Sequence, residues 1–214
     1  MGVSAAFAVA ARSPRLRGMV TLSEVRELVR RDLSDLVEAR WPDAQLDRHI
    51  AHALDEFSLA LPRELSATVA TTAGNRDLSL AGLPGLIEVE TVEFPLDKFP
   101  PGYIGFSTWG ETLSVHLEVE PDGSDAKLYY TAMHTLDDDG STLPAPHVEF
   151  VVMGAAAYAA EEASSGAIGA LNIDPAAAER YAAWSRARLT AFRQLLHTYG
   201  RKNRVRARRL YAPA

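Results

Sequence analysis

The 214-residue sequence contains no cysteine, which excludes disulfide bonds, thiolate nucleophiles and thiolate metal sites. A chain without cysteine fits a reducing interior, or a particle assembled there. No apolar run approaches the roughly 20 residues that a membrane-spanning helix needs, so we expect no association with a membrane. The six histidines form no His-Glu-x-x-His pattern.

Signature motifs of common enzyme classes are also missing. The sequence has no Gly-x-Ser-x-Gly, no Walker A motif and no Gly-x-Gly-x-x-Gly. Gly82-Leu83-Pro84-Gly85 matches a Gly-x-x-Gly pattern, but it holds no cation and lies between predicted strands, so we interpret it as a turn. Because the sequence shows no combination of a nucleophile, a general base and oxyanion-stabilising groups, we expect neither an enzyme nor a bound cofactor.

Two segments leave a metal-dependent enzyme open as an alternative. His49, His52 and Asp55 have the spacing of possible ligands on one helix. Their helical angles point away from the apolar stripe of that helix, which favours a solvent-exposed face. The loop Asp137-Asp138-Asp139-Gly140 resembles a calcium loop, but it lacks the alternating carboxylates and the later glutamate of an EF-hand. A polar linker is therefore the favoured interpretation of this loop.

Charge is divided unevenly along the chain. Residues 201–214 carry six basic side chains and no acidic one, so removing them from a chain of net charge −6 leaves a body of −12. Such a body binds nucleic acid poorly, because cations drive contact with phosphates. The tail ends in an apolar and aromatic pair that suits a segment ordering against a partner. Its candidate binding residues are Arg201, Lys202, Arg204, Arg206, Arg208, Arg209, Leu210 and Tyr211.

A helical hairpin is predicted over residues 19–62, after a flexible extension at residues 1–18. Thr21-Leu22-Ser23-Glu24 has the spacing of a capping box that opens the first helix. Its predicted buried face comprises Val25, Leu28, Val29, Leu33 and Leu36, whereas Arg26, Arg30 and Arg31 are expected off this face.

The second helix of the hairpin follows Trp41 and Pro42, which end the preceding segment. We expect Asp43 to cap it and Pro62 to end it. Its apolar stripe at helical spacing comprises Leu46, Ile50, Ala53, Leu54, Phe57 and Leu61.

An antiparallel β-module, a small sandwich or barrel, is predicted over residues 63–134. Short alternating or β-branched runs are separated there by glycine and proline turns. The expected strands are 65–71, 77–80, 86–94, 103–108, 112–119 and 127–133.

The C-terminal third returns to helix. A polar linker at 135–146 precedes a helix from His147 to about Ser165, whose small-sided centre predicts packing on more than one side. Gly166 and Gly169 are expected to break it. Asp174-Pro175 then opens a long helix to about Tyr199, which Gly200 ends before the tail at 201–214. Its predicted core residues are Tyr181, Trp184, Leu189, Phe192, Leu195 and Leu196.

These segments together predict an α+β fold. Helices of residues 147–200 pack on the N-terminal hairpin to form a bundle, the β-module is inserted between them, and a basic C-terminal tail follows.

The order of these elements resembles the head–tail connector (adaptor) proteins of tailed bacteriophages and prophages. The resemblance rests on Arg40-Trp41-Pro42-Asp43-Ala44-Gln45-Leu46 opening a helix that ends at Leu61-Pro62-Arg63. A strand, a turn at Gly74 and Leu78-Ser79-Leu80 follow in the same order. The similarity covers residues 20–94 most clearly and 145–211 in outline.

This resemblance implies a non-enzymatic virion subunit, assembled in the host bacterial cytoplasm. Such subunits form a ring, usually of twelve copies, beneath the portal protein and link the DNA-filled head to the stopper or tail-completion protein. DNA passes through the ring without specific binding. C-terminal segments of the family commonly contact the portal, a role that would fall here to Arg201–Tyr211.

Two points qualify this expectation. Many adaptors are nearly all-helical, whereas the β-module here is large. The alternative function is a nucleic-acid-binding module that uses the same basic tail, and it predicts a steeply salt-dependent affinity for duplex DNA.

Overall fold

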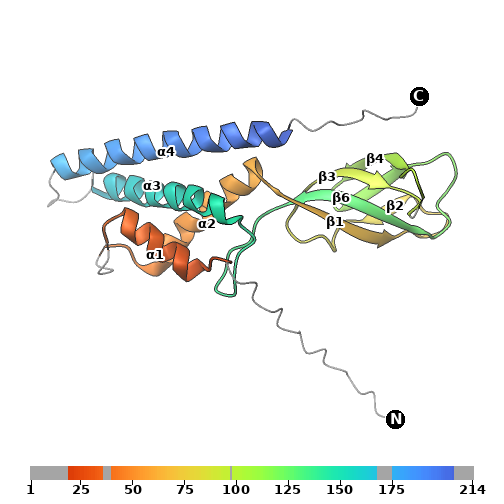
Figure 1. Cartoon of the computed structure of the whole chain (residues 1–214), viewed down its shortest axis with the longest axis horizontal. Helices are drawn as coiled ribbons and strands as arrows, with labels where there is room; N and C mark the ends of the chain where they lie inside the picture. The colour runs from red at the N-terminus through yellow and green to blue at the C-terminus, as the bar shows by residue number, and fades with distance from the viewer. Residues whose placement is uncertain (1–18, 36–39, 97, 168–174, 205–214) are drawn as a thin grey trace, which may run out of the picture.

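The structure is a computed structural model that describes residues 19–35, 40–96, 98–167 and 175–204. Within them, a bundle of four α-helices occupies one end of the molecule and a β-module projects from it (Figure 1). This arrangement confirms the predicted α+β fold with an inserted β-module. The elements in chain order are α1 (Leu22–Asp32), α2 (Asp43–Ala60), β1 (Arg63–Ala70), β2 (Asp77–Ser79), β3 (Leu86–Glu93), β4 (Tyr103–Trp109), β5 (Thr112–His116), β6 (Asp125–Ala132), a 3₁₀ turn η1 (Ala145–His147), α3 (Val148–Ala167) and α4 (Pro175–Arg204).

Helix α3 is the centre of the bundle and packs against α1, α2 and α4. The small residues at its centre are buried, in agreement with the predicted packing on more than one side, and their size lets the neighbouring helices approach closely. At Gly154, an added Cβ atom would lie 2.9 Å from the Phe192 ring and 3.0 Å from Ala53. The buried small residues of α3 are Ala155, Ala156, Ala157, Ala159 and Ala160.

The expected stripe of α2 is buried at every position, from Leu46 to Leu61. On α4, Leu189, Phe192 and Leu196 are buried, and Tyr181 and Trp184 pack half-buried at the edge of the same core. The capping box of α1 is also confirmed, because the Thr21 hydroxyl accepts from Glu24 N–H while the Glu24 carboxylate accepts from Thr21 N–H.

Two predicted helix ends were wrong. Gly166 lies inside α3, which continues to Ala167, and Gly200 lies inside α4, which continues to Arg204. Gly200 is required by packing between helices, because an added Cβ atom would lie 2.9 Å from the Ala60 carbonyl oxygen. This glycine therefore lets α4 touch the end of α2 instead of ending α4. Gly169 and Asp174 lie outside the described residues, as does Leu36.

The β-module is one curled, antiparallel six-stranded sheet in the order β1-β6-β3-β4-β5-β2. No helix of the described residues covers the sheet, so its apolar face is buried by the curling of the sheet on itself. Residues of all six strands share one core, separate from the core of the bundle. Positive φ angles at Gly74, Gly85, Gly110 and Gly123 mark turns between strands, and the Gly82–Gly85 segment is the turn before β3.

The junction between bundle and β-module is built around His134, which follows β6. Its backbone N–H donates to the Ser58 hydroxyl over 3.0 Å. Its Nε2 lies 3.1 Å from the Leu61 carbonyl oxygen, and its Nδ1 lies 3.0 Å from the Thr142 carbonyl oxygen and 3.2 Å from the Thr142 hydroxyl. A neutral imidazole donates through one ring nitrogen only, so it bonds one of the two carbonyls at a time. Burial lowers the pKa of His134 below its ordinary value, against the opposite effect of both carbonyls.

Candidate functional site

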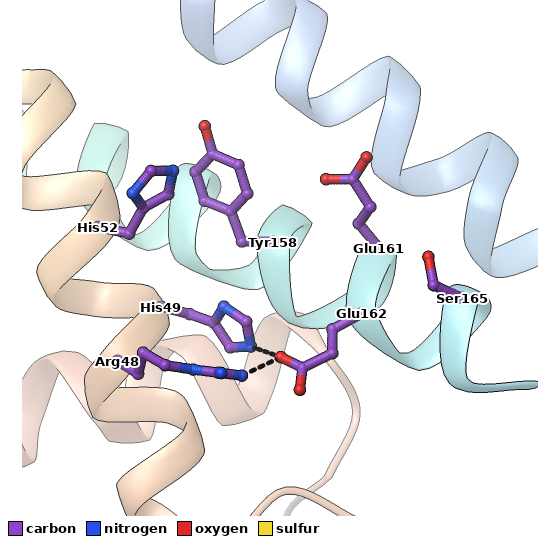
Figure 2. Close-up of a pocket in the computed structure, with 7 residues that line it drawn as sticks. All are labelled: Arg48, His49, His52, Tyr158, Glu161, Glu162 and Ser165. Carbon is purple, nitrogen blue, oxygen red and sulfur yellow. Dashed lines mark hydrogen bonds and ion pairs between the residues drawn. The ribbon is translucent and has the colours of Figure 1, made fainter.

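One group of titratable side chains of the bundle lines an open hollow of about 440 Å³ between α2 and α3. Figure 2 shows Arg48 and His49 of α2 pointing across to Glu162 of α3, with the His52 ring beside Tyr158. The spacing of α2 explains this geometry, because residues three and four apart share one side of a helix. The remaining lining residues are Glu161 and Ser165 of α3.

Glu162 is the shared partner of the cations on α2. It pairs with Arg48, and its Oε2 lies 2.7 Å from Nε2 of His49. The latter is an ion-pair distance, but the ring N–H is not aimed well enough for a hydrogen bond. The Arg48 hydrogen bond lowers the pKa of Glu162, while burial lowers the pKa of His49 against the pull of that carboxylate. His49 is therefore a buried imidazole that favours its neutral form.

A second chain of contacts crosses the hollow from α2 to α4. The Tyr158 hydroxyl donates to Glu56 over 2.7 Å and accepts from Arg193 over 3.4 Å. Burial, followed by the hydrogen bond to Glu56, raises the pKa of Tyr158. A tyrosine held in this way is a poorer acid than a free one. The polar groups of the hollow thus bind one another and tie α2, α3 and α4 together.

The sequence placed His49, His52 and Asp55 on a solvent-exposed face, and this prediction was wrong for His49. His49 is 8% exposed, whereas His52 and Asp55 are exposed. The error arises because α3 covers the edge of the apolar stripe, which sequence periodicity alone does not reveal. The three side chains do not converge, since His49 points to Glu162 and the His52 ring meets the Tyr158 ring edge to face, with centroids 4.4 Å apart.

The Asp137–Gly140 loop is closed by its own hydrogen bonds. One carboxylate oxygen of Asp137 accepts the backbone N–H groups of Asp139 and Gly140, each over 2.9 Å. The Asp137 carbonyl accepts from Leu22 N–H at the start of α1, so the loop also anchors this helix. Within the described part of the chain, no cluster of three or more histidine or acidic residues could hold a metal ion.

A buried ionic network lies beneath the Arg40–Leu46 motif, and the sequence did not reveal it. Arg30 was expected off the buried face of α1, but it is only 4% exposed. Its guanidinium donates to Asp35 over 3.3 Å, to the Trp41 carbonyl over 3.0 Å and to Asp43. Asp35 in turn accepts from Trp41 N–H.

This network also corrects the prediction that Asp43 caps α2. The N-cap residue is Pro42, and no side chain caps the helix. The Asp43 carboxylate instead pairs with Arg26 and Arg30 of α1, so it fixes the angle of the helical hairpin. The signal that could have revealed the network is Arg30 between Val29 and Leu33 of the predicted apolar face, followed by Asp35 and Asp43.

Three of the six cations assigned to the tail lie at the end of α4, which continues through Arg201 and Lys202 to Arg204. Arg206, Arg208, Arg209, Leu210 and Tyr211 lie outside the described residues. The basic segment is therefore in part a helical extension of the bundle, and its binding role stays a prediction.

The hollow, the Arg30 network and the His134 junction all hold elements of the fold together, which is the arrangement expected of a structural protein. Comparison with family models matches residues 20–213 to the SU10 adaptor protein family, so the chain belongs to that family. It is a bacteriophage adaptor, a structural virion protein that interacts with other head or tail proteins. A search of curated proteins gave no match. No helix among the described residues is long and apolar enough to span a membrane.

Proposed function

We propose that the protein forms a ring beneath the portal and links the DNA-filled head to the stopper or tail-completion protein. The observation that carries this proposal is the family match, which runs through the bundle, the β-module and the basic end of the chain. The usual twelve-copy ring of connector proteins makes a dodecamer the expected assembly.

The charge of the chain supports this role. A body of net charge −12 repels DNA, so a ring of such bodies would let DNA pass without holding it. The basic C-terminus has the opposite sign and could bind an acidic groove of the portal. Twelve copies of one weak contact would gain strongly from avidity.

The experiment compares the full chain with a chain ending at residue 200 for binding to isolated portal rings. We expect the full chain to bind and the truncated chain to lose most of its affinity. The His52→Gln variant is the matched control, because it alters an exposed residue of α2 and leaves residues 201–214 unchanged. Undiminished binding by the truncated chain would remove Arg201–Tyr211 from the mechanism.

The second candidate, a nucleic-acid-binding module, is supported by the position of Arg201, Lys202 and Arg204 on a preformed helix. Its test is duplex-DNA binding by the full chain between about 50 and 200 mM salt, where contacts to several phosphates lose affinity by orders of magnitude. No measurable binding at the lower salt concentration would end this candidate.

A further inference from the structure

The two edges of the six-stranded sheet are built differently. At one edge lies β2, with three residues, and at the other lies β1, with eight. Natural proteins protect sheet edges by short strands, bulges, proline or charged residues, because an open edge pairs readily with another strand. The shortness of β2 protects its edge. In contrast, β1 pairs with β6 in an unbroken register, and its segment Ser66–Ala70 contains no charge, proline or glycine.

The backbone groups of β1 alternate between β6 and the open edge. Thr71 N–H donates to the Ser124 carbonyl over 3.4 Å, in continuation of the β1–β6 register. Every second residue of an antiparallel strand bonds the same neighbour, so the odd-numbered residues of β1 face β6. Ser66, Thr68 and Ala70 therefore direct their N–H and C=O groups to the other side. Among the residues that the structure describes, no strand pairs with that side of β1.

The side chains of β1 leave apolar surface at this edge. Leu65, Ala67 and Val69 lie opposite residues of β6 that are buried, and they pack against the core of the sheet. They are themselves only half-buried. A further strand beside β1 would cover them, which is favourable because it removes apolar surface from water. Ser66 and Thr68 are exposed on the opposite, outer surface.

The sequence of β1 is complementary to itself when two copies run antiparallel with Ala67 opposite Ala67. In this register Ser66 lies opposite Thr68 of the second copy, and the edge-facing backbone groups of these two residues bond reciprocally. Their hydroxyl side chains form a favourable cross-strand pair. On the core face Leu65 lies opposite Val69 of the second copy, so apolar side chains also meet.

Other antiparallel registers fit less well. A shift by one residue places edge-facing groups of one strand opposite groups that already bond β6 in the other, so no ladder forms. A shift by two residues in one direction sets Arg63 opposite the apolar Val69. The same shift in the other direction sets Leu65 opposite Thr71, beyond the end of β1. The register centred on Ala67 is therefore the best matched of those that allow hydrogen bonds.

We propose that two copies of the free protein pair antiparallel along β1, with the twofold axis at Ala67, and so join their sheets into one. Because β1 runs from the bundle to the far end of the β-module, this pairing places the two bundles at opposite ends of the joined strands (Figure 1). A twofold contact is closed at two copies, whereas a ring needs contacts that continue from copy to copy. The pair is thus a state of the protein outside the proposed ring, in which its open edge is covered.

The absence of cysteine from the chain makes a crosslinking test direct. In Ala67→Cys the two introduced thiols lie opposite each other at a non-hydrogen-bonded pair, where the Cα atoms are about 4.5 Å apart. Disulfides form at such separations. We expect the full chain with this substitution to form a disulfide-linked dimer on mild oxidation, detected by non-reducing electrophoresis.

Ala70→Cys is the matched control for the crosslink, because it is the same substitution on the same strand. In the proposed register its two thiols lie about 20 Å apart along the strands, too far for a disulfide. Crosslinking of Ala70→Cys as readily as Ala67→Cys, or of neither, would contradict the register.

Sedimentation velocity over a range of protein concentrations measures the pairing without a crosslink. The wild-type chain is expected to show a monomer–dimer equilibrium. Thr68→Pro removes an edge-facing N–H group, and edge strands tolerate proline at such positions. We expect this variant to keep its circular dichroism spectrum and to pair at least about tenfold more weakly, because each copy loses a hydrogen bond and presents a proline ring to the other.

Ser79→Pro on β2 is the matched control for the opposite edge. Leu80 N–H donates to the Glu111 carbonyl, so the N–H group of the preceding Ser79 faces away from β5. This variant should pair as the wild type does. Equal weakening by Ser79→Pro and Thr68→Pro would mean that β1 pairs with β2 of the next copy, and it would overturn the twofold pair.

A wild-type chain that stays monomeric at every concentration would also overturn the inference. So would a folded Thr68→Pro variant that pairs with wild-type strength. If Thr68→Pro loses its folded spectrum, the comparison of Ala67→Cys with Ala70→Cys decides the question by itself.

Discussion

Arg30 shows how one charged side chain can determine a helical hairpin. It is buried with Asp35 and also pairs with the half-exposed Asp43, so the junction of α1 and α2 depends on ionic contacts. Removing one member of a buried pair leaves the other charge without compensation, which costs more than the pair itself contributes.

We therefore expect Arg30→Met to destabilise the protein by about 3–5 kcal/mol, mainly because the buried Asp35 carboxylate loses its compensating positive charge. Chemical denaturation monitored by circular dichroism measures this change. Arg31→Met is the control, because Arg31 is exposed on the same helix and its loss should cost less than about 0.5 kcal/mol. Equal effects of the two substitutions would contradict a special role of Arg30.

Two buried histidines make stability depend on pH. Burial lowers the pKa of His49 and of His134 in the folded protein, so the unfolded chain takes up protons first as the pH falls. The folded protein has its full stability from the neutral histidines above about pH 6.5. It loses this contribution as the pH falls through the folded-state pKa values. Each proton taken up only on unfolding contributes up to about 1.4 kcal/mol per pH unit.

The free energy of unfolding should thus decrease between pH 7 and pH 5, and His49→Gln should reduce this dependence. Denaturation curves at a series of pH values test it. His52→Gln, which alters an exposed histidine one turn away on α2, is expected to behave as the wild type. Loss of the pH dependence in both variants or in neither would argue against buried His49 as its source.

At the scale of elements, α3 depends on a glycine at its most crowded point. Gly154→Ala would place a methyl group 2.9 Å from the Phe192 ring, and such overpacking costs about 1–3 kcal/mol. Gly166→Ala in the same helix meets no atom within 4 Å and should stabilise α3 by up to about 1 kcal/mol. Thermal unfolding of both variants gives the comparison, and a stabilising Gly154→Ala would refute the close packing.

Local signals predicted the elements well, and contacts between elements account for what they missed. All six strands were predicted, with ends within three residues of the observed ones, because turns at Gly74, Gly110 and Gly123 are local events with positive φ angles. Gly200 was misjudged because its role is to contact Ala60 of another helix. Likewise, the burial of Arg30 and His49 depends on which helix covers them, and periodicity along one helix does not contain that information.

At the scale of the whole molecule, the bundle and the β-module are two separate cores joined near His134. The basic end of α4 leaves the bundle near this junction, where it packs against the end of α2 at Gly200. Two separate cores give the molecule separate surfaces, which the proposed position between the head and the tail would use.

The tail should bind the portal through charge and through its apolar end, and the two contributions are separable. Replacing Arg206, Arg208 and Arg209 by glutamine should weaken portal binding and reduce its salt dependence. Replacing Leu210 and Tyr211 by alanine should weaken binding while leaving its salt dependence intact. Binding isotherms at several salt concentrations distinguish the two, and identical salt slopes in all variants would contradict the electrostatic part.

The most direct test of the proposed function is an electron cryomicroscopy reconstruction of the virion neck. The account predicts a ring directly beneath the portal into which this helical bundle and its curled six-stranded sheet can be fitted. A neck without such a ring, or this fold found at another place in the particle, would contradict it.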